Sequence, residues 1–257
     1  WAACMDSTVS LWNPSLSLVK KISLASSSAT ALVQVNKMVF IADAKSIFVF
    51  DAHSYKLIKT VDLPTLEYVS PDDSTSTTET SQGELHRAPT VVKLDRTTTG
   101  TIAGRPAAVS SNEPWIGYFV RCMAQVEDYV WVCTDGFVCF IEIATLTVVP
   151  KVHIPIPKIN SLVYVKSTNQ VWGGCSDCSI YIWDAAVPTS TGTIDPVRQL
   201  SGWCKDRVSK LALWEDKYIY SGSWDKRLRV WDAQTATLVS EPKKLHECPI
   251  MSIVVLP

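Results

Sequence analysis

Glycine and histidine are scarce in this chain, and their scarcity disfavours two classes of site. Only ten of the 257 residues are glycine, too few to favour a glycine-rich loop that holds a phosphate. The dinucleotide fingerprint, the P-loop, the nucleophile elbow and the HExxH zinc motif are all missing from the sequence. The four histidines are scattered. We therefore expect a non-catalytic domain with no cofactor and no metal.

An excess of charge and long apolar runs are also lacking. The 24 Lys and Arg residues and 25 Asp and Glu residues leave a net charge of −1, so the composition gives no basic footprint for nucleic acid. No window reaches the roughly 18 unbroken apolar residues of a membrane helix. The N-terminus lacks the regions of a signal peptide. It also begins without Met and within a pattern, so we expect a piece of a longer protein.

The eight cysteines do not outline a small secreted domain. Cys133, Cys139 and Cys175 lie in apolar, strand-like runs, where a free cysteine acts as a small hydrophobe. A reducing intracellular compartment, the cytoplasm, is the expected setting. The stretch "CSDC" ending at Cys178 has metal-ligand spacing, but no second CxxC or histidine pair completes four ligands. We interpret it as a hairpin turn.

What the chain does contain is an internal repeat. The stretches "GGCSDCSIYIWD" (173–184) and "SGSWDKRLRVWD" (221–232) share one pattern, 48 residues apart. In each, an Asp in a predicted turn, Asp177 or Asp225, precedes a Trp-Asp pair by six residues. The repeat predicts a structural unit that the chain uses more than once.

Three weaker copies follow the same pattern. Asp6 leads to Trp12, and Asp135 leads to Ile141, again six residues later. In a further copy Phe50 takes the Trp position, but its turn acid, Asp43, is one residue too far away. Acids that recur at equivalent turns are structural, because each can cap a hairpin through backbone hydrogen bonds. We therefore assign none of them to catalysis.

Strand patterns surround each copy. Short runs rich in Val, Ile, Tyr and Trp are bounded by Asp, Gly and Ser, and no stretch shows a sustained helical period with caps. Four short strands recur about every 40 residues, and a sheet of this kind must stack on copies of itself. The predicted strands are 116–126, 129–134, 137–143, 159–165, 170–175, 179–184, 208–214, 217–223 and 227–232.

These copies resemble the WD-repeat family, over about 1–63 and 116–257. The resemblance implies an all-β fold, a β-propeller of four-stranded antiparallel blades. It also implies a hydrogen-bonded tetrad of a turn Asp, a His, a Ser or Thr and the Trp. The last copy alone offers all four members, which are Ser221, Asp225, Trp231 and His246.

We expect residues 1–257 to form one propeller domain. Five repeats are recognisable, and either a shared blade closes a five-bladed ring or the opening blades of a seven-bladed propeller have been cut away. Residues 69–113 are polar and rich in Ser and Thr, which predicts a loop insertion on the face that carries Asp225.

A cluster of aromatic and basic residues near the last copy is the candidate partner-binding site. Trp and Arg dominate interface hot spots, and these residues gather around one predicted turn. The alternative is a local cation–π or packing group that stabilises one blade. The cluster comprises Trp203, Arg207, Trp224, Lys226 and Arg227.

The expected function is a platform for other proteins or peptides, as one domain of a larger intracellular signalling protein. Fold alone does not decide function, and two alternatives stay open. One is a phosphoinositide-binding propeller, for which Lys205 and Lys210 would extend the basic cluster. The other is a regulatory propeller attached to a catalytic domain such as a lipid phosphatase, an exchange factor or a kinase.

Overall fold

A computed structural model gives the structure of the protein. The chain divides into two units, Trp1–Pro64 with Gly117–Pro257, and Thr65–Ile116. The expected insertion at 69–113 lies outside the described residues. The structure describes residues 1–3, 6–24, 29–43, 46–63, 119–135, 137–153, 158–186, 192–240, 243–244 and 246–255.

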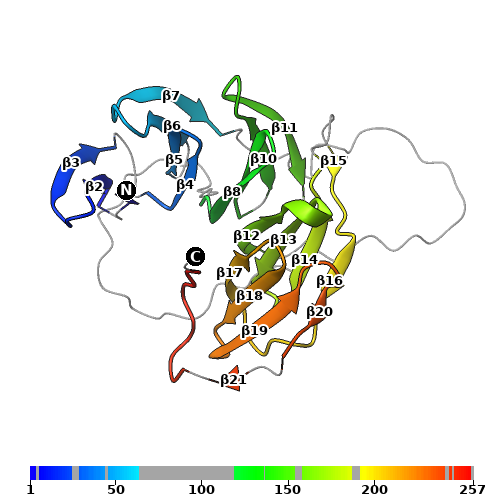
Figure 1. Ribbon diagram of the computed structural model, residues 1–257. Helices are drawn as coiled ribbons and strands as arrows, with labels where there is room; N and C mark the ends of the chain where they lie inside the picture. The colour runs from blue at the N-terminus through cyan, green and yellow to red at the C-terminus, as the bar shows by residue number, and fades with distance from the viewer. Residues whose placement is uncertain are drawn as a thin grey trace, which may run out of the picture. The chain divides into compact units, whose positions relative to one another are not determined.

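Antiparallel β-sheets, taken in chain order, make up the described part of the chain (Figure 1). The first sheet has three described strands in the order β1-β2-β3 and the second has four in the order β4-β5-β6-β7. Their bounds are β1 (Ala2–Ala3), β2 (Thr8–Trp12), β3 (Leu18–Ser23), β4 (Ala31–Val35), β5 (Met38–Ala42), β6 (Ser46–Asp51) and β7 (Leu57–Asp62).

The third sheet repeats the meander and adds a short parallel strand at its edge, in the order β15-β11-β10-β9-β8. Pro150 lies in β11, between β10 and the short β15. The bounds are β8 (Cys122–Val126), β9 (Tyr129–Cys133), β10 (Val138–Glu142), β11 (Thr147–His153) and β15 (Gly192–Thr193).

The last two sheets carry the two strong sequence repeats. Their orders are β12-β13-β14-β16 and β17-β18-β19-β20, and β21 also pairs with β19. The described residues include one short 3₁₀ helix, η2 (Lys166–Thr168), and no α-helix. The bounds are β12 (Ile159–Val165), β13 (Gln170–Cys175), β14 (Ile180–Asp184), β16 (Arg198–Leu200), β17 (Val208–Trp214), β18 (Tyr218–Ser223), β19 (Arg227–Asp232), β20 (Thr237–Leu238) and β21 (Lys243–Lys244).

The predicted strands are confirmed to within one or two residues, with one exception. Of the strand predicted over 116–126, residues 116–118 lie outside the described residues, and the observed strand starts at Cys122. The N–H group of Arg121 still donates to the carbonyl of Cys133, although Cys133 already lies opposite Cys122 in the ladder. Two residues therefore share one partner, and the regular pairing ends there, as at a β-bulge.

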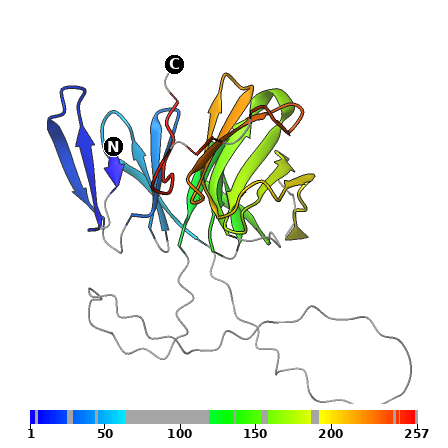
Figure 2. The same cartoon turned by 90° about the horizontal axis from the view of Figure 1, so that it is seen from below.

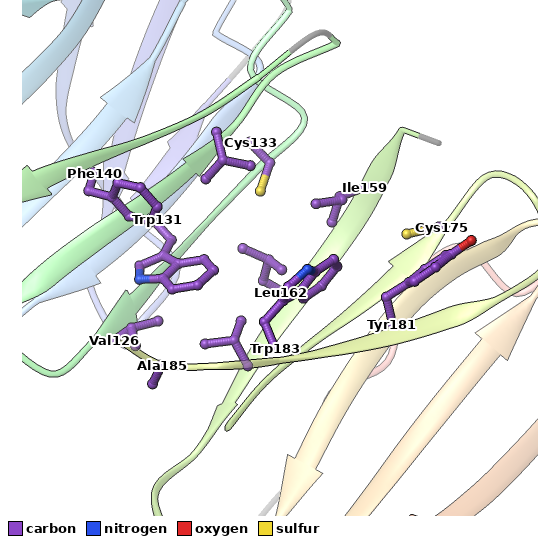
Figure 3. Close-up of a cluster of buried hydrophobic side chains, with 12 residues drawn as sticks. Val126, Trp131, Cys133, Phe140, Ile159, Leu162, Cys175, Tyr181, Trp183 and Ala185 are labelled. Atoms are coloured by element: carbon purple, nitrogen blue, oxygen red, sulfur yellow. The ribbon is translucent and has the colours of Figure 1, made fainter. Parts of the chain in front are cut away.

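Large aromatic side chains fill the space between consecutive sheets. Trp131 packs edge-on against Phe140 within the third sheet, with ring centroids 4.9 Å apart. Both belong to one buried cluster with Leu162 and Trp183 of the next sheet (Figure 3). Such side chains bury the most apolar surface of any residue type. The sheets therefore stack face to face through apolar cores.

Glycines allow the close approach between the last two sheets. A Cβ atom added to Gly174 would lie 2.6 Å from a methyl carbon of Val208 and 3.4 Å from Leu211. The side chain of Asn160 also donates to the carbonyl oxygen of Val208 at 2.9 Å. The start of β17 thus packs directly on the backbone of β13.

The C-terminal segment, residues 246–255, makes the same kind of contact with the last sheet. A Cβ atom added to Gly222 would lie 2.5 Å from Ile250 and 3.1 Å from Ile253. The hydroxyl of Ser209 donates to the carbonyl oxygen of Ile250. Figures 1 and 2 show this segment in red beside the orange strands. Ile250 and Ile253 thus take the places that Val208 and Leu211 take one sheet earlier.

Candidate interaction surface

The turn acids of three repeats cap their hairpins as predicted. The backbone N–H group two residues after the acid donates to its carboxylate at 3.1 Å in each case, which are Asp6, Asp177 and Asp225. Asp43, the acid one residue out of place, accepts from the N–H group of Ser46 three residues later, at 2.7 Å. Asp43 therefore still accepts a backbone hydrogen bond from the start of β6.

Asp135 does not cap its turn in this way. The N–H group of Phe137 donates to the hydroxyl of Thr134 at 3.1 Å instead. The carboxylate of Asp135 forms an ion pair with Arg121 and lies 3.6 Å from the ammonium of Lys158. The prediction of a common cap is therefore wrong for Asp135, because a threonine hydroxyl occupies the N–H group that the carboxylate would bind.

The turn of the last repeat contains a buried ion pair. Two guanidinium nitrogens of Arg229 contact the two carboxylate oxygens of Asp225 at 3.1 and 2.6 Å. The side chains are only 1% and 5% exposed. A bidentate pair of this kind is short and specific in geometry. It fixes the turn to the strand β19 that follows.

The pKa of Asp225 is lowered from its ordinary value, in spite of burial. Desolvation by itself raises the pKa of a carboxyl group. The hydrogen bonds from Arg229 and from the backbone N–H groups of Lys205 and Arg227, together with the guanidinium charge, act in the opposite direction and outweigh it. Asp225 is therefore ionised at neutral pH.

The preceding repeat has a neutral counterpart of this pair. The hydroxyl of Tyr181 donates to Asp177 at 2.8 Å, again from four residues after the acid. Burial, followed by this hydrogen bond, raises the pKa of Tyr181. Figure 3 shows the ring of Tyr181 beside Trp183. A donor four residues after the turn acid therefore serves both strong repeats.

The tetrad expected from the resemblance is present only in part. The indole N–H of Trp231 donates to the hydroxyl of Ser221 at 2.8 Å, and both residues are buried. His246, however, is exposed. Arg229 provides the donor for Asp225 that was expected from His246. The assignment of His246 is wrong, because a longer cationic side chain on the same hairpin already occupies the carboxylate.

In the preceding repeat, glycine stands where serine would bind the tryptophan. Gly173 matches Ser221 in the ladder, since each lies ten residues before its Trp. A Cβ atom on Gly173 would lie 2.6 Å from the ring of Trp183. The indole nitrogen of Trp183 is buried and has no hydrogen-bond partner among the described residues. Close ring packing here replaces the Trp-to-Ser hydrogen bond.

The segment before β17 is held firmly over the Asp225 turn. Arg229 donates to the carbonyl oxygen of Trp203 at 2.6 Å, and the N–H group of Lys205 donates to Asp225 at 3.0 Å. Two further hydrogen bonds join Ser223 to the carbonyl of Asp206 and the N–H of Trp224 to the carbonyl of Arg207. The segment therefore presents its side chains from a fixed backbone.

The structure brings the predicted partner-binding residues together around this turn. The name "turn patch" is used below for the surface of residues 203–207 and 224–229. Trp203 is 48% exposed, and the edge contact of its ring with Trp231 has a centroid distance of 5.9 Å. The exposed or half-buried predicted members are Trp203, Arg207, Trp224, Lys226 and Arg227.

One contact within the turn patch matches the alternative interpretation. The guanidinium carbon of Arg207 lies 3.6 Å from the ring centroid of Trp224. This is a cation–π contact, which stabilises a surface turn by roughly 0.5–1 kcal/mol. Trp224 therefore has a local structural partner, whereas the more exposed Trp203 offers open aromatic surface.

The described strands on either side of the expected insertion contact turns of the same kind. Asp62, at the end of β7, accepts a hydrogen bond from the hydroxyl of Ser46, which follows the Asp43 turn. Arg121, just before β8, pairs with Asp135. The chain thus leaves one sheet and enters the next beside an acid turn. The predicted overhang of residues 69–113 lies outside the described residues.

The stretch "CSDC" is the sequence motif with metal-ligand spacing. Cys175 is buried and Cys178 half-buried, and both are free thiols. Within the described part of the chain, no group of three or more His, Cys, Asp or Glu side chains could hold a metal ion. No helix there has the length and apolar character needed to cross a membrane.

The sequence pattern did not single out Arg229 and Tyr181 as partners of the turn acids. Residues two apart in a strand lie on the same face, so a donor placed four residues after the turn acid can reach back to it. The sequences "DKRLR" and "DCSIY" carry this signal. This signal is not apparent locally, because Arg229 and Tyr181 lie in strand-like runs. Whether their side chains are buried beside the acid depends on the neighbouring sheets.

Comparison with known proteins supports the architecture alone. No family model and no curated protein matches the sequence. Among the solved structures that resemble this one is the crystal structure of the computationally designed Ika8 protein, with a TM-score of 0.61 and 18% sequence identity. The match covers 99% of this chain and 61% of the designed protein, so this chain spans less than two thirds of its length. At this identity the likeness shows a shared fold: repeated, antiparallel, all-β.

Proposed function

We propose that this chain is a non-catalytic β-propeller of the WD-repeat type that binds partner proteins through the turn patch. The main support is Trp203, a half-exposed aromatic ring on a backbone fixed by a buried ion pair. Aromatic anchors on rigid supports are typical of interface hot spots. A fixed backbone also reduces the entropy that is lost on binding.

The stacked sheets and the C-terminal segment support the propeller proposal. Each described sheet repeats the same meander, and Ile250 and Ile253 pack as the first strand of a further sheet would. The first sheet, β1-β2-β3, has one strand fewer than the four-stranded meander of the second. The proposal therefore keeps two alternatives open: a five-bladed ring that is closed by a shared blade, and a seven-bladed propeller whose opening blades have been cut away.

The experiment compares partner capture by two tryptophan variants. Partners that the protein captures from lysate are identified, and their affinities are then measured for Trp203→Ala and for Trp12→Ala. Trp12 is a matched control, because it is 51% exposed but lies on a different sheet. We expect Trp203→Ala to weaken binding by about 2 kcal/mol or more, with little change in melting temperature.

The opposite pattern would contradict the proposal. A Trp203→Ala variant that loses thermal stability but keeps its affinity would identify the ring as a packing group of one hairpin. Equal losses of affinity for the two variants would remove the turn patch from the interface. Trp224→Ala, which also breaks the cation–π contact with Arg207, tests whether the patch acts as a unit.

A further inference from the structure

The turn patch concentrates positive charge in a chain whose net charge is slightly negative. Its two segments carry five cationic and two acidic side chains, whereas the whole chain has a net charge of −1. The ion pair between Arg229 and Asp225 removes one charge of each sign from the surface. Asp206 accepts a hydrogen bond from the backbone N–H of Arg207 at 2.7 Å. The patch therefore remains basic.

Its four other cations have no acidic partner among the residues that the structure describes. Among the described residues, no ion pair involves Lys205, Arg207, Lys226 or Arg227. Other basic residues of the chain do have such partners: Arg121 and Lys158 pair with Asp135. Unpaired cations beside an exposed aromatic ring can bind a ligand with negative charges and an apolar group.

We propose that the turn patch binds an acidic peptide segment of a partner protein. Carboxylates of the peptide would contact Lys205, Lys226 and Arg227, and one apolar side chain would cover the exposed ring of Trp203. The guanidinium of Arg207 lies over Trp224, and its N–H groups can still bind a carboxylate at two points. This assignment rests on the proposed function and names the chemistry of its partner.

A peptide fits these observations better than a lipid surface. Membrane attachment by charge depends on basic residues that face anionic headgroups together. Here the exposed Asp206 lies between Lys205 and Arg207, and its charge would repel a dense layer of phosphates. A peptide can place its carboxylates beside the cations and leave Asp206 in water. Charge complementarity of this kind sets specificity and association rate.

The test selects peptides from a phage-displayed library of short random sequences on the intact protein. We expect selected peptides to be rich in Asp and Glu and to contain a large apolar residue. Their affinity should fall at least about tenfold in the charge reversal Lys226→Glu/Arg227→Glu. It should also fall as added salt shortens the screening length to about 8 Å.

A matched charge reversal provides the control. Lys37→Glu/Lys56→Glu changes the same number of charges at exposed positions of the β4–β7 sheet, and it should leave peptide affinity unchanged. Circular dichroism and melting temperature confirm that both variants fold. Trp203→Ala is measured on the same peptides.

The possible outcomes separate this inference from the proposed function. Peptides that depend on Trp203 but not on Lys226 and Arg227 would overturn the acidic class and leave the interaction surface standing. If peptide binding depends on none of Trp203, Lys226 and Arg227, both the acidic-peptide inference and the proposed interaction surface are wrong. If no peptide is selected, and phosphoinositide vesicles bind the protein but not its charge reversal, the surface belongs to a membrane and the peptide assignment is wrong.

Discussion

The pair of Asp225 and Arg229 decides the structure of the turn patch at the scale of single residues. Its carboxylate binds two backbone N–H groups, and its guanidinium binds the carbonyl of Trp203. Two segments of chain, residues 203–205 and residues 225–229, therefore meet at one pair of charges. Both charges are buried, so the loss of either partner leaves the other desolvated and unpaired.

Asp225→Asn should lower the free energy of unfolding by about 3–5 kcal/mol, the usual effect of breaking a buried ion pair. The double variant Asp225→Asn/Arg229→Met should recover much of this loss, because it removes both charges. Stability is measured by urea unfolding. A single variant as stable as wild type would show that the pair is hydrated in solution.

The same pair predicts how stability depends on pH. The folded pKa of Asp225 lies below its ordinary value of 3.8. The contribution of this group to stability is then complete above about pH 4 and is lost as the pH falls through the lowered pKa. The difference in stability between wild type and Asp225→Asn should therefore shrink below pH 4. A constant difference would refute this linkage.

Ser221 and Gly173 occupy the same position of the repeat and accommodate the buried tryptophan in two different ways. Ser221→Ala should cost about 1–3 kcal/mol, because the buried indole N–H of Trp231 loses its acceptor. Gly173→Ala should cost a similar amount for a different reason, since the new Cβ would overlap the ring of Trp183. The exposed Ser201→Ala is the control in thermal unfolding. Equal stability of all three variants would contradict both assignments.

Among the hairpins and strands, the C-terminal segment is the element whose role is least apparent from its local sequence pattern. It forms no ladder in the described structure, yet Ile250 is 8% exposed and Met251 beside it is 64% exposed. This alternation follows from docking on β18, where Gly222 leaves room for Ile250. The segment thus adds apolar cover to the last sheet.

Ile250→Ala should lower the free energy of unfolding by about 2 kcal/mol, whereas Met251→Ala should have almost no effect. The physical reason is the lost packing on β18, which hydrogen exchange can follow at the N–H groups of Tyr218–Ser223. If the two variants behave alike, the segment is not docked in solution.

At the scale of the whole molecule, repetition is the organising feature. One kind of interface occurs twice at the end of the chain: a glycine on β13 or β18 faces branched apolar side chains, which come from β17 in the first case and from the C-terminal segment in the second. Each sheet is too thin to bury both faces, so its stability depends on its neighbours. The likeness to the designed Ika8 protein, at a TM-score of 0.61, agrees with this arrangement.

The amino-acid sequence by itself determined the strands and most turns. Alternating apolar residues and recurrent turn acids act over a few neighbours, so they were enough to locate β9, β10, β12–β14 and β17–β19. The same local logic identified the caps at Asp6, Asp177 and Asp225. The hydrogen bond from Trp231 to Ser221 followed from the resemblance to a known repeat.

Only the tertiary structure decided which long side chains meet. The local pattern places Arg229 in a strand, and nothing in it shows that the segment of Trp203 covers the guanidinium and removes it from water. His246 was assigned to Asp225 by position alone, and Arg229 forms that contact instead. At the Asp135 turn, the hydroxyl of Thr134 binds the N–H group of Phe137, and the carboxylate of Asp135 pairs with Arg121 instead. These outcomes depend on which donors and acceptors lie close together in the folded chain. The spacing of residues in the sequence does not show this.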